Sequence, residues 1–143
     1  MTVTTVEILW TYEDIAPHNI FKDRSNPTCI GFSIEIAGQK LMITGDSSTE
    51  EFLIAGIRYG DYLKSDIVQL SHHGYGDGSV PHSFYEYVDA PYAICAGLGG
   101  GYGEGERWAM ENAGVYILRE KYGTVILNLP YNGGEFESTI KPE

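Results

Sequence analysis

Apolar residues recur along the chain with the two periods that distinguish strands from helices. Short runs in which they alternate or cluster between turn residues predict strands. These runs are residues 3–10, 30–37, 40–44, 66–71, 92–96, 115–118 and 124–129. Segments with helical spacing follow capping or turn residues at 47–59, 81–88 and 106–112. Because strands and helices alternate after a leading hairpin, the pattern predicts an α/β or α+β fold, with a mixed β-sheet and flanking helices.

The leading hairpin is the clearest local prediction. Its first strand carries an apolar face, formed by Ile30, Phe32, Ile34 and Ile36. Gly38-Gln39 supplies a tight turn before the chain returns. Upstream, residues 11–27 are polar and contain two prolines, which predicts a long loop. With 143 residues and no internal repeat, the chain is predicted to form a single domain over residues 1–143.

Composition and charge narrow the class of partner. Apolar residues make up 43% of the chain, which is enough for a packed core. The 20 acidic and 9 basic residues give a net charge of -11. Phosphate-tracking surfaces need clustered Lys and Arg, and here these residues are scattered, so the sequence carries no nucleic-acid signal and no signal for an anionic membrane surface. No run is long and apolar enough to span a bilayer, and no signal-peptide pattern occurs.

Several familiar catalytic motifs are missing. The glycine-rich stretches at 74–78 and 97–105 fit neither the dinucleotide fingerprint nor the P-loop, and no Gly-x-Ser-x-Gly elbow occurs. Tyr75 and Tyr102 are instead candidate walls of a substrate pocket. Cys29 and Cys95 lie in apolar surroundings outside any Cys-x-x-Cys pair, and we expect buried free thiols.

Asp46 and the pair His72-His73 follow two successive predicted strands, joined by a predicted helix. In a right-handed β-α-β unit both strand ends lie on the same edge of the sheet, where catalytic residues gather. A carboxylate beside an imidazole is a suitable ligand pair for zinc, iron or manganese. The alternative is that Asp46 only caps a turn or helix. Adjacent side chains on extended backbone point to opposite faces, so one histidine is expected to have a supporting role.

The same residues resemble the metallo-β-lactamase superfamily. Residues 41–46 (Leu-Met-Ile-Thr-Gly-Asp) followed by 66–74 (Asp-Ile-Val-Gln-Leu-Ser-His-His-Gly) are similar to the branch found in ComEC-type DNA-uptake proteins. In that branch a Thr-Gly-Asp closes one strand and a His-His-Gly closes the next; the stretch 92–129 resembles it too. The resemblance implies half of an αββα sandwich around a two-metal centre. It implies that Asp46 bridges the metals and that His72, in preference to His73, is the terminal ligand of the second metal.

The departures from the family pattern concern the missing ligands. The family's leading His-x-His-x-Asp-His signature is absent, and the only other histidines, His18 and His82, are expected to be solvated, as is Asp77. Asn26 stands where many superfamily members have a histidine, and this branch often has asparagine there. Glu104 stands in a Tyr-Gly-Glu-Gly loop where the branch often has Tyr-Gly-His-Pro, so a role of this loop in protonation is in doubt.

We therefore expect the C-terminal portion of a metal-dependent hydrolase of phosphoester or related bonds, inactive by itself. Asp46 and His72 are the expected catalytic and metal-binding residues, with His73 as the less favoured ligand and zinc as the first candidate ion. The other ligands would come from an N-terminal half or from a second copy in a homodimer. The alternative is a non-catalytic interaction or assembly module that forms homodimers.

Overall fold

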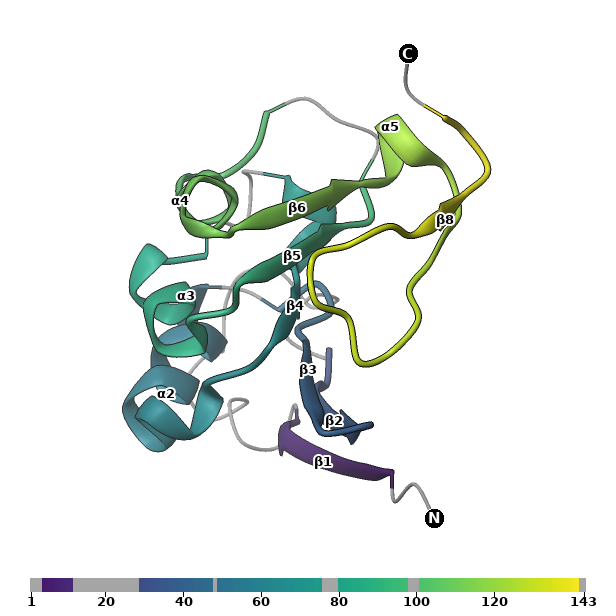
Figure 1. The fold of residues 1–143 in the computed structure, drawn as a ribbon. Helices are drawn as coiled ribbons and strands as arrows, with labels where there is room; N and C mark the ends of the chain where they lie inside the picture. Colours follow the sequence, from purple (N-terminus) through teal and green to yellow (C-terminus); the bar gives the residue numbers. More distant parts are fainter. Residues whose placement is uncertain (1–3, 12–28, 48, 76–79, 98–100, 142–143) are drawn as a thin grey trace.

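A computed structural model describes residues 4–11, 29–47, 49–75, 80–97 and 101–141, the side chains of 115 and 118–120 excepted (Figure 1). Its main sheet has six strands in the order β1-β2-β3-β4-β5-β6. These strands are β1 (Thr5–Trp10), β2 (Gly31–Ile36), β3 (Gln39–Ile43), β4 (Ile67–Gln69), β5 (Tyr92–Cys95) and β6 (Val115–Leu118). The first three pair antiparallel, and β3 to β6 pair parallel. The predicted mixed α/β fold is therefore confirmed.

Helices connect the parallel strands and cover one face of the sheet (Figure 1). They are α2 (Thr49–Tyr59), α3 (His82–Val88) and α4 (Glu104–Asn112), with a short 3₁₀ turn η2 (Gly60–Leu63) after α2. Gly60 ends α2 in a left-handed conformation with φ +49°. Beneath the helices lies the larger apolar core, in which Trp10 packs edge to face against Phe52 and Phe84. The three expected helices are thus present, with boundaries shifted by one or two residues.

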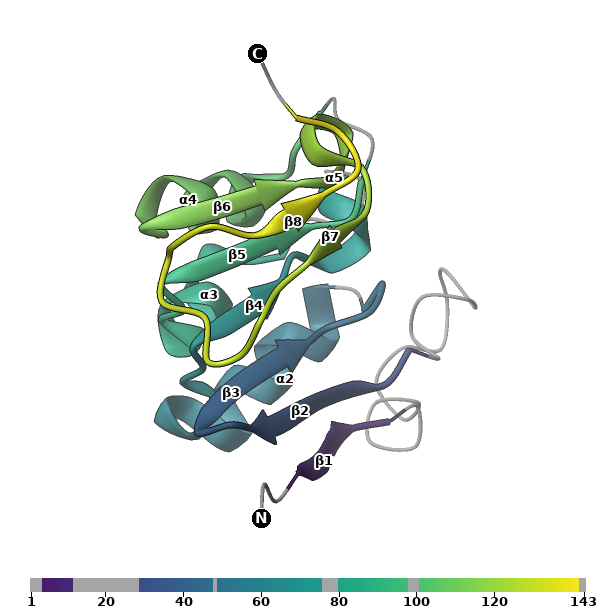
Figure 2. The same ribbon diagram turned by 45° about the vertical axis from the view of Figure 1, so that its right-hand side comes forward.

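The C-terminal segment packs on the opposite face of the sheet (Figure 2). It contains α5 (Arg119–Tyr122), β7 (Val125–Ile126) and β8 (Glu137–Ser138). The strand predicted over 124–129 is shorter in the structure, where β7 covers Val125–Ile126 and pairs with β8 in a separate two-stranded sheet. Tyr131 and the surrounding apolar residues of this segment close a second, smaller core over β4 to β6.

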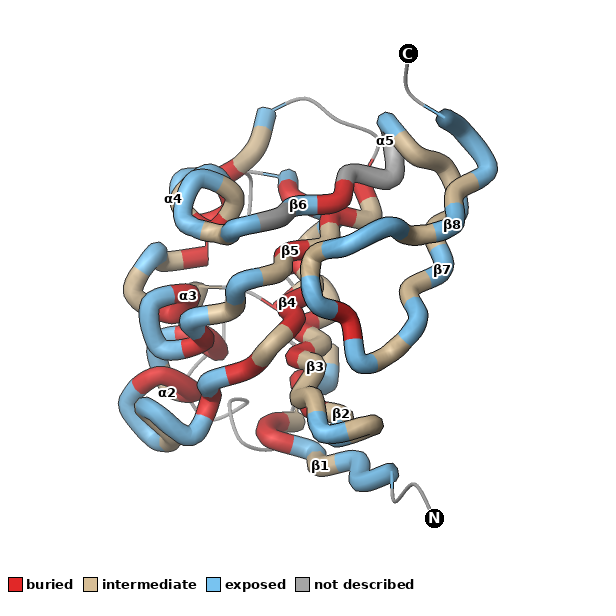
Figure 3. Tube along the Cα trace, viewed as in Figure 1, coloured by how far each residue is buried: buried red, intermediate tan, exposed pale blue. Residues whose placement is uncertain are grey.

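The same sheet face is open over β1 to β3. Paired residues form a row across the strands, Val6–Ile34–Leu41–Ile67, and their side chains share one face. Along this row the exposed fraction falls from 60% at Val6 to 2% at Ile67, where the C-terminal segment begins to cover it. Figure 3 shows the same trend, with exposed positions along β1 and buried ones in the centre of the sheet. Among the described residues, the C-terminal segment therefore covers only half of an apolar sheet face.

Two turns differ from prediction in ways that affect the site. The hairpin turns at Ala37-Gly38, with φ +53° and +77°, one residue earlier than predicted. The strand predicted over 66–71 ends at Gln69, and a tight turn, η3 (Ser71–Gly74), follows it. The histidine pair therefore lies in a turn rather than on extended backbone.

Candidate metal centre

Backbone hydrogen bonds join the two loops that carry Asp46 and the histidine pair. The N–H of His72 donates to the carbonyl oxygen of Gly45 over 3.0 Å. The hydroxyl of Ser71 donates to the same carbonyl over 3.1 Å. Gly45 itself turns the chain out of β3 with φ +58°. The parallel pairing of β3 with β4 thus brings together two loops that are distant in sequence, as the β-α-β pattern predicts.

The turn that carries the histidines is left-handed over three residues. His72, His73 and Gly74 have φ of +46°, +55° and +82°. Left-handed backbone costs a residue with a side chain on the order of 1–2 kcal/mol, so surrounding contacts must hold the turn in place. The carbonyl oxygen of His73 accepts a hydrogen bond from the thiol of Cys95 over 3.3 Å. At Gly97 an added Cβ would lie 2.0 Å from that oxygen, so only glycine fits there.

This turn places the imidazole of His73 beside the carboxyl group of Asp46. The Nε2 atom of His73 lies 3.6 Å from Oδ2 of Asp46, with the two side chains 50% and 33% exposed. The His72 ring lies instead 6.4 Å, centroid to centroid, from the ring of Tyr75. The sequence favoured His72 as the ligand, whereas the geometry brings His73 to the carboxylate. The reason is the left-handed turn, which reverses the directions that extended backbone would give to neighbouring side chains.

The Asp46–His73 pair has the spacing of two ligands on one metal ion. Zinc ligands lie about 2.0–2.2 Å from the ion, so two of them at a tetrahedral ion are about 3.4 Å apart. The pair at 3.6 Å therefore fits one edge of such a site. Within the described ranges, no group of three or more His, Cys, Asp or Glu side chains could hold an ion. Two ligands would be fewer than the three that zinc hydrolases take from protein.

Of the remaining candidates, the structure describes His82 and the two cysteines. His82 at the start of α3 lies beside Glu104 at the start of α4, with 3.6 Å between Nδ1 of the histidine and Oε1 of the glutamate. His18, Asn26 and Asp77 lie outside the described residues. Cys95 is a buried free thiol as predicted, whereas the free thiol Cys29 is only half-buried.

The two glycine-rich loops lie against each other next to the histidine turn. Tyr75 and Tyr102 pair through their backbones in an isolated antiparallel bridge. The N–H of Gly103 also donates to the carbonyl oxygen of Gly74 over 3.3 Å. The two tyrosines therefore lie next to the histidine turn, and their role as walls of a substrate pocket stays a prediction.

A buried polar cluster beneath the histidine turn was not predicted. Tyr85 and Glu106 are both fully enclosed, and their side chains are hydrogen bonded over 3.4 Å. Burial raises the pKa of Glu106 to about 7 and that of Tyr85 well above 10. In the sequence, Glu106 resembles an ordinary acidic residue in the first turn of a helix, which the helix dipole favours. Only its apolar neighbours hinted at burial.

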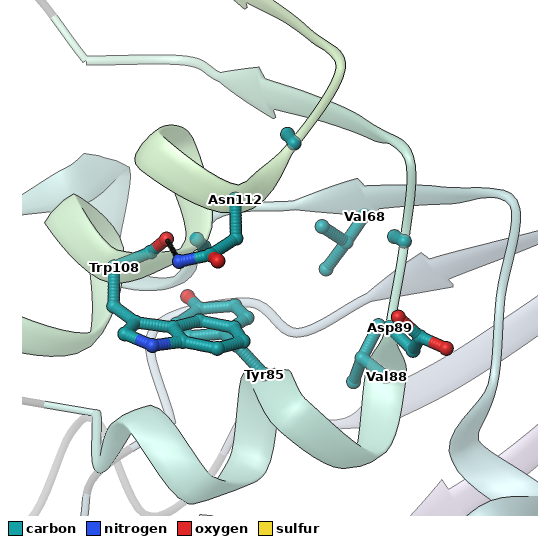
Figure 4. Close-up of a pocket in the computed structure, with 9 residues that line it drawn as sticks. Val68, Tyr85, Val88, Asp89, Trp108 and Asn112 are labelled. Carbon is teal, nitrogen blue, oxygen red and sulfur yellow. Dashed lines mark hydrogen bonds between the residues drawn. The ribbon is translucent and has the colours of Figure 1, made fainter.

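A small cavity between α3 and α4 lies elsewhere (Figure 4). It is lined by Val68, Tyr85, Val88 and Trp108, among others, and its volume is about 30 Å³. Asp89 and Ala90, which also line it, directly precede β5 and so lie at the amino-terminal end of that strand. Asp46 and His73 lie at the carboxyl ends of the parallel strands. The cavity is large enough for a water molecule and too small for a substrate.

Comparisons with protein-family models and with curated proteins find no match for this chain. In the part of the chain that the structure describes, no helix combines the length and apolarity required to cross a membrane.

Proposed function

We propose that this chain is one half of a metal-dependent hydrolase of the metallo-β-lactamase type, acting on phosphoester or related bonds. The Asp46–His73 pair carries the proposal, because a carboxylate and an imidazole meet at ligand spacing at the ends of two neighbouring parallel strands. The similarity of residues 41–46 and 66–74 to the ComEC-like branch agrees with this position. The chain would be inactive alone, since two ligands do not complete a hydrolytic site.

In this proposal Asp46 and His73 hold a divalent ion from one side, with His72 as the alternative ligand. Zinc is the first candidate, and iron or manganese are the others. When bound, such an ion lowers the pKa of a water molecule and polarises the bond to be cleaved. The protein itself holds the side chains of Asp46 and His73 in position. Ser71 does so through its hydrogen bonds to the carbonyl oxygens of Gly45 and Ser47.

The missing ligands would come from an N-terminal half that carries the His-x-His-x-Asp-His motif and docks on the open sheet face. This face combines the row that begins at Val6 with a second row, Ile8–Phe32–Ile43. The charged residues of these strands alternate with the two rows and so belong to the helix-bearing face; they are Glu7, Glu35 and Lys40. A sheet face without charges is suited to a protein partner rather than to water. Ile43 also lies just before Asp46, so a body seated here would reach the metal pair.

A homodimeric assembly module is the second candidate, favoured because β1 is an edge strand of the main sheet in the described part of the chain. In that case a second copy covers the open face, and Asp46 has no part in chemistry.

The two functions differ in what Asp46 does. We expect the natural full-length gene product to hydrolyse bis(p-nitrophenyl) phosphate, to lose this activity with chelator, and to regain it with Zn²⁺.

Asp46→Asn should abolish the hydrolysis, whereas Asp61→Asn on the exposed η2 turn is the matched control and should leave it unchanged. A homodimer in which Asp46→Asn behaves like the wild-type protein would favour the assembly module instead.

A further inference from the structure

Glu106 is a fully enclosed carboxyl group in the first turn of α4. Its Oε1 atom accepts a hydrogen bond from the hydroxyl of Tyr85 over 3.4 Å. Its Oε2 atom is also buried and has no hydrogen-bond partner within the described ranges. An enclosed carboxyl group lowers the stability of the folded state, and an apolar side chain of the same size would lower it less. Packing alone therefore does not account for this residue.

Tyr85 connects this carboxyl group to the histidine turn. The backbone N–H of Ser71 donates to the phenol oxygen of Tyr85 over 3.1 Å. An N–H group can only donate, so the tyrosine accepts at this contact and its own proton is left for Glu106. When Glu106 is ionised it can only accept, and the direction of both hydrogen bonds is then fixed. They form a relay from α4 through α3 to the residue directly before His72.

Ser71 is the anchor of the strained turn. Its hydroxyl is held by the carbonyl oxygens of Gly45 and Ser47, and its N–H is held by Tyr85. The left-handed residues His72 and His73 follow at once, so the position of Ser71 sets where the imidazole of His73 points. If the Tyr85 contact is lost, a buried N–H is left unpaired, which destabilises this position of the turn. Moving the turn is the way to recover that loss.

We propose that Glu106 and Tyr85 are positioning residues that hold the His72–His73 turn, so that the imidazole of His73 faces Asp46. Glu106 fixes the hydroxyl of Tyr85, Tyr85 fixes the N–H of Ser71, and Ser71 fixes the turn. The role of the relay in metal binding rests on the proposed function. Its effect on the orientation of His73 does not.

The test follows the four histidines by nuclear magnetic resonance, in protein labelled with carbon-13 at Cε1 of histidine and without added metal. His72→Ala and His73→Ala variants assign the two signals. Tyr85→Phe removes the hydroxyl, and Glu106→Leu removes its acceptor. Glu106→Gln keeps an oxygen at the same place and is the conservative variant.

Matched controls lie on the same helices and face solvent. Tyr87→Phe on α3 and Glu111→Gln on α4 make the same chemical changes outside the relay. Circular dichroism and cooperative urea unfolding show which variants are folded. If Tyr85→Phe does not fold, the comparison of Glu106→Leu with Glu106→Gln decides, because both retain Tyr85.

We expect Tyr85→Phe and Glu106→Leu to shift the His73 signal and Glu106→Gln and both controls to leave it in place. The proposal is overturned if the folded Tyr85→Phe and Glu106→Leu variants leave the signal where it is. It is also overturned if Glu106→Gln shifts the signal as far as Glu106→Leu does. Because no metal is needed, failure of this test is distinct from failure of the metal proposal, which the Asp46 variants test.

Discussion

Replacing Glu106 with glutamine should stabilise the protein at alkaline pH and have little effect at acidic pH. The pKa of Glu106 is raised from 4.5 to about 7 because its carboxyl group is fully enclosed. Between these two pH values the folded state binds more protons than the unfolded state. The free energy of unfolding of the wild-type protein therefore falls as the pH rises through this window. Glutamine carries no charge at any pH, so the variant escapes this loss.

The size of the effect follows from the shift. One pKa unit corresponds to about 1.4 kcal/mol, so the full shift amounts to about 3 kcal/mol once Glu106 is ionised. The advantage of Glu106→Gln over the wild-type protein should be below about 1 kcal/mol near pH 5 and should grow by about 2–3 kcal/mol towards pH 8. For a domain whose total stability is about 5–15 kcal/mol, this is a large change.

Urea unfolding near pH 5, 6, 7 and 8, followed by circular dichroism, measures this difference directly. Glu111→Gln on the exposed side of the same helix is the matched control, and its difference from wild type should stay within about 0.5 kcal/mol over the range. The reasoning is refuted if Glu106→Gln shows the same difference at both ends of the range. It is also refuted if this variant is the less stable protein near pH 8.

Three further predictions concern the site and the open face. Ile8→Lys should abolish assembly, measured by light scattering, and should change the unfolding free energy of the single chain by less than about 0.5 kcal/mol. The control Ile57→Lys on α2 should change neither quantity. If the Ile8→Lys variant still assembles, this face is not the interface. Gly97→Ala should displace the His73 carbonyl, because the added Cβ would lie 2.0 Å from its oxygen. Zn²⁺ binding of the full-length protein, measured by titration calorimetry, should then weaken roughly 10-fold or more. An unchanged affinity would contradict the geometry of the turn. In the same titration His73→Ala should weaken binding more than His72→Ala does, and the reverse order would restore His72 as the ligand.

The general position of the site could be predicted because it depends on local patterns. Period-two runs, a helical segment and turn glycines mark out β3, α2 and β4, and parallel pairing then brings Gly45-Asp46 beside the histidine pair. Each of these signals is carried by residues close together in the sequence. The position of Asp46 therefore required no knowledge of distant contacts.

The placement of the His73 imidazole beside Asp46 could not be predicted in this way. The sequence suggested extended backbone up to the pair, whereas three consecutive left-handed residues reverse the turn. Such a conformation is held by tertiary contacts, namely the Cys95 thiol and the close approach of Gly97, which lie on another strand and loop. Only one of the three residues is a glycine, so the residue types alone do not predict a left-handed turn here.

Two other features depend on register and packing between distant elements. Each strand alone shows only alternating apolar and polar residues. The open apolar face is recognised only when the register is known, because that register aligns Val6 with Ile34 and Ile34 with Leu41. The C-terminal strand is shorter than predicted, and the segment after β6 crosses to the other face and pairs with β8. Hydrophobic periodicity cannot tell which face or partner a strand will take.

The metal content of protein purified without chelators tests the central claim most directly. Elemental analysis should be made on single chains and on assembled protein separated by size, for the wild-type sequence and for Asp46→Asn, His73→Ala and the control Asp61→Asn. We expect close to zero metal in single chains and about one or two zinc, iron or manganese ions per chain in the assembled protein. Asp46→Asn and His73→Ala should remove this metal, and Asp61→Asn should retain it. Assembled protein whose metal content does not change with Asp46 or His73 would contradict the account.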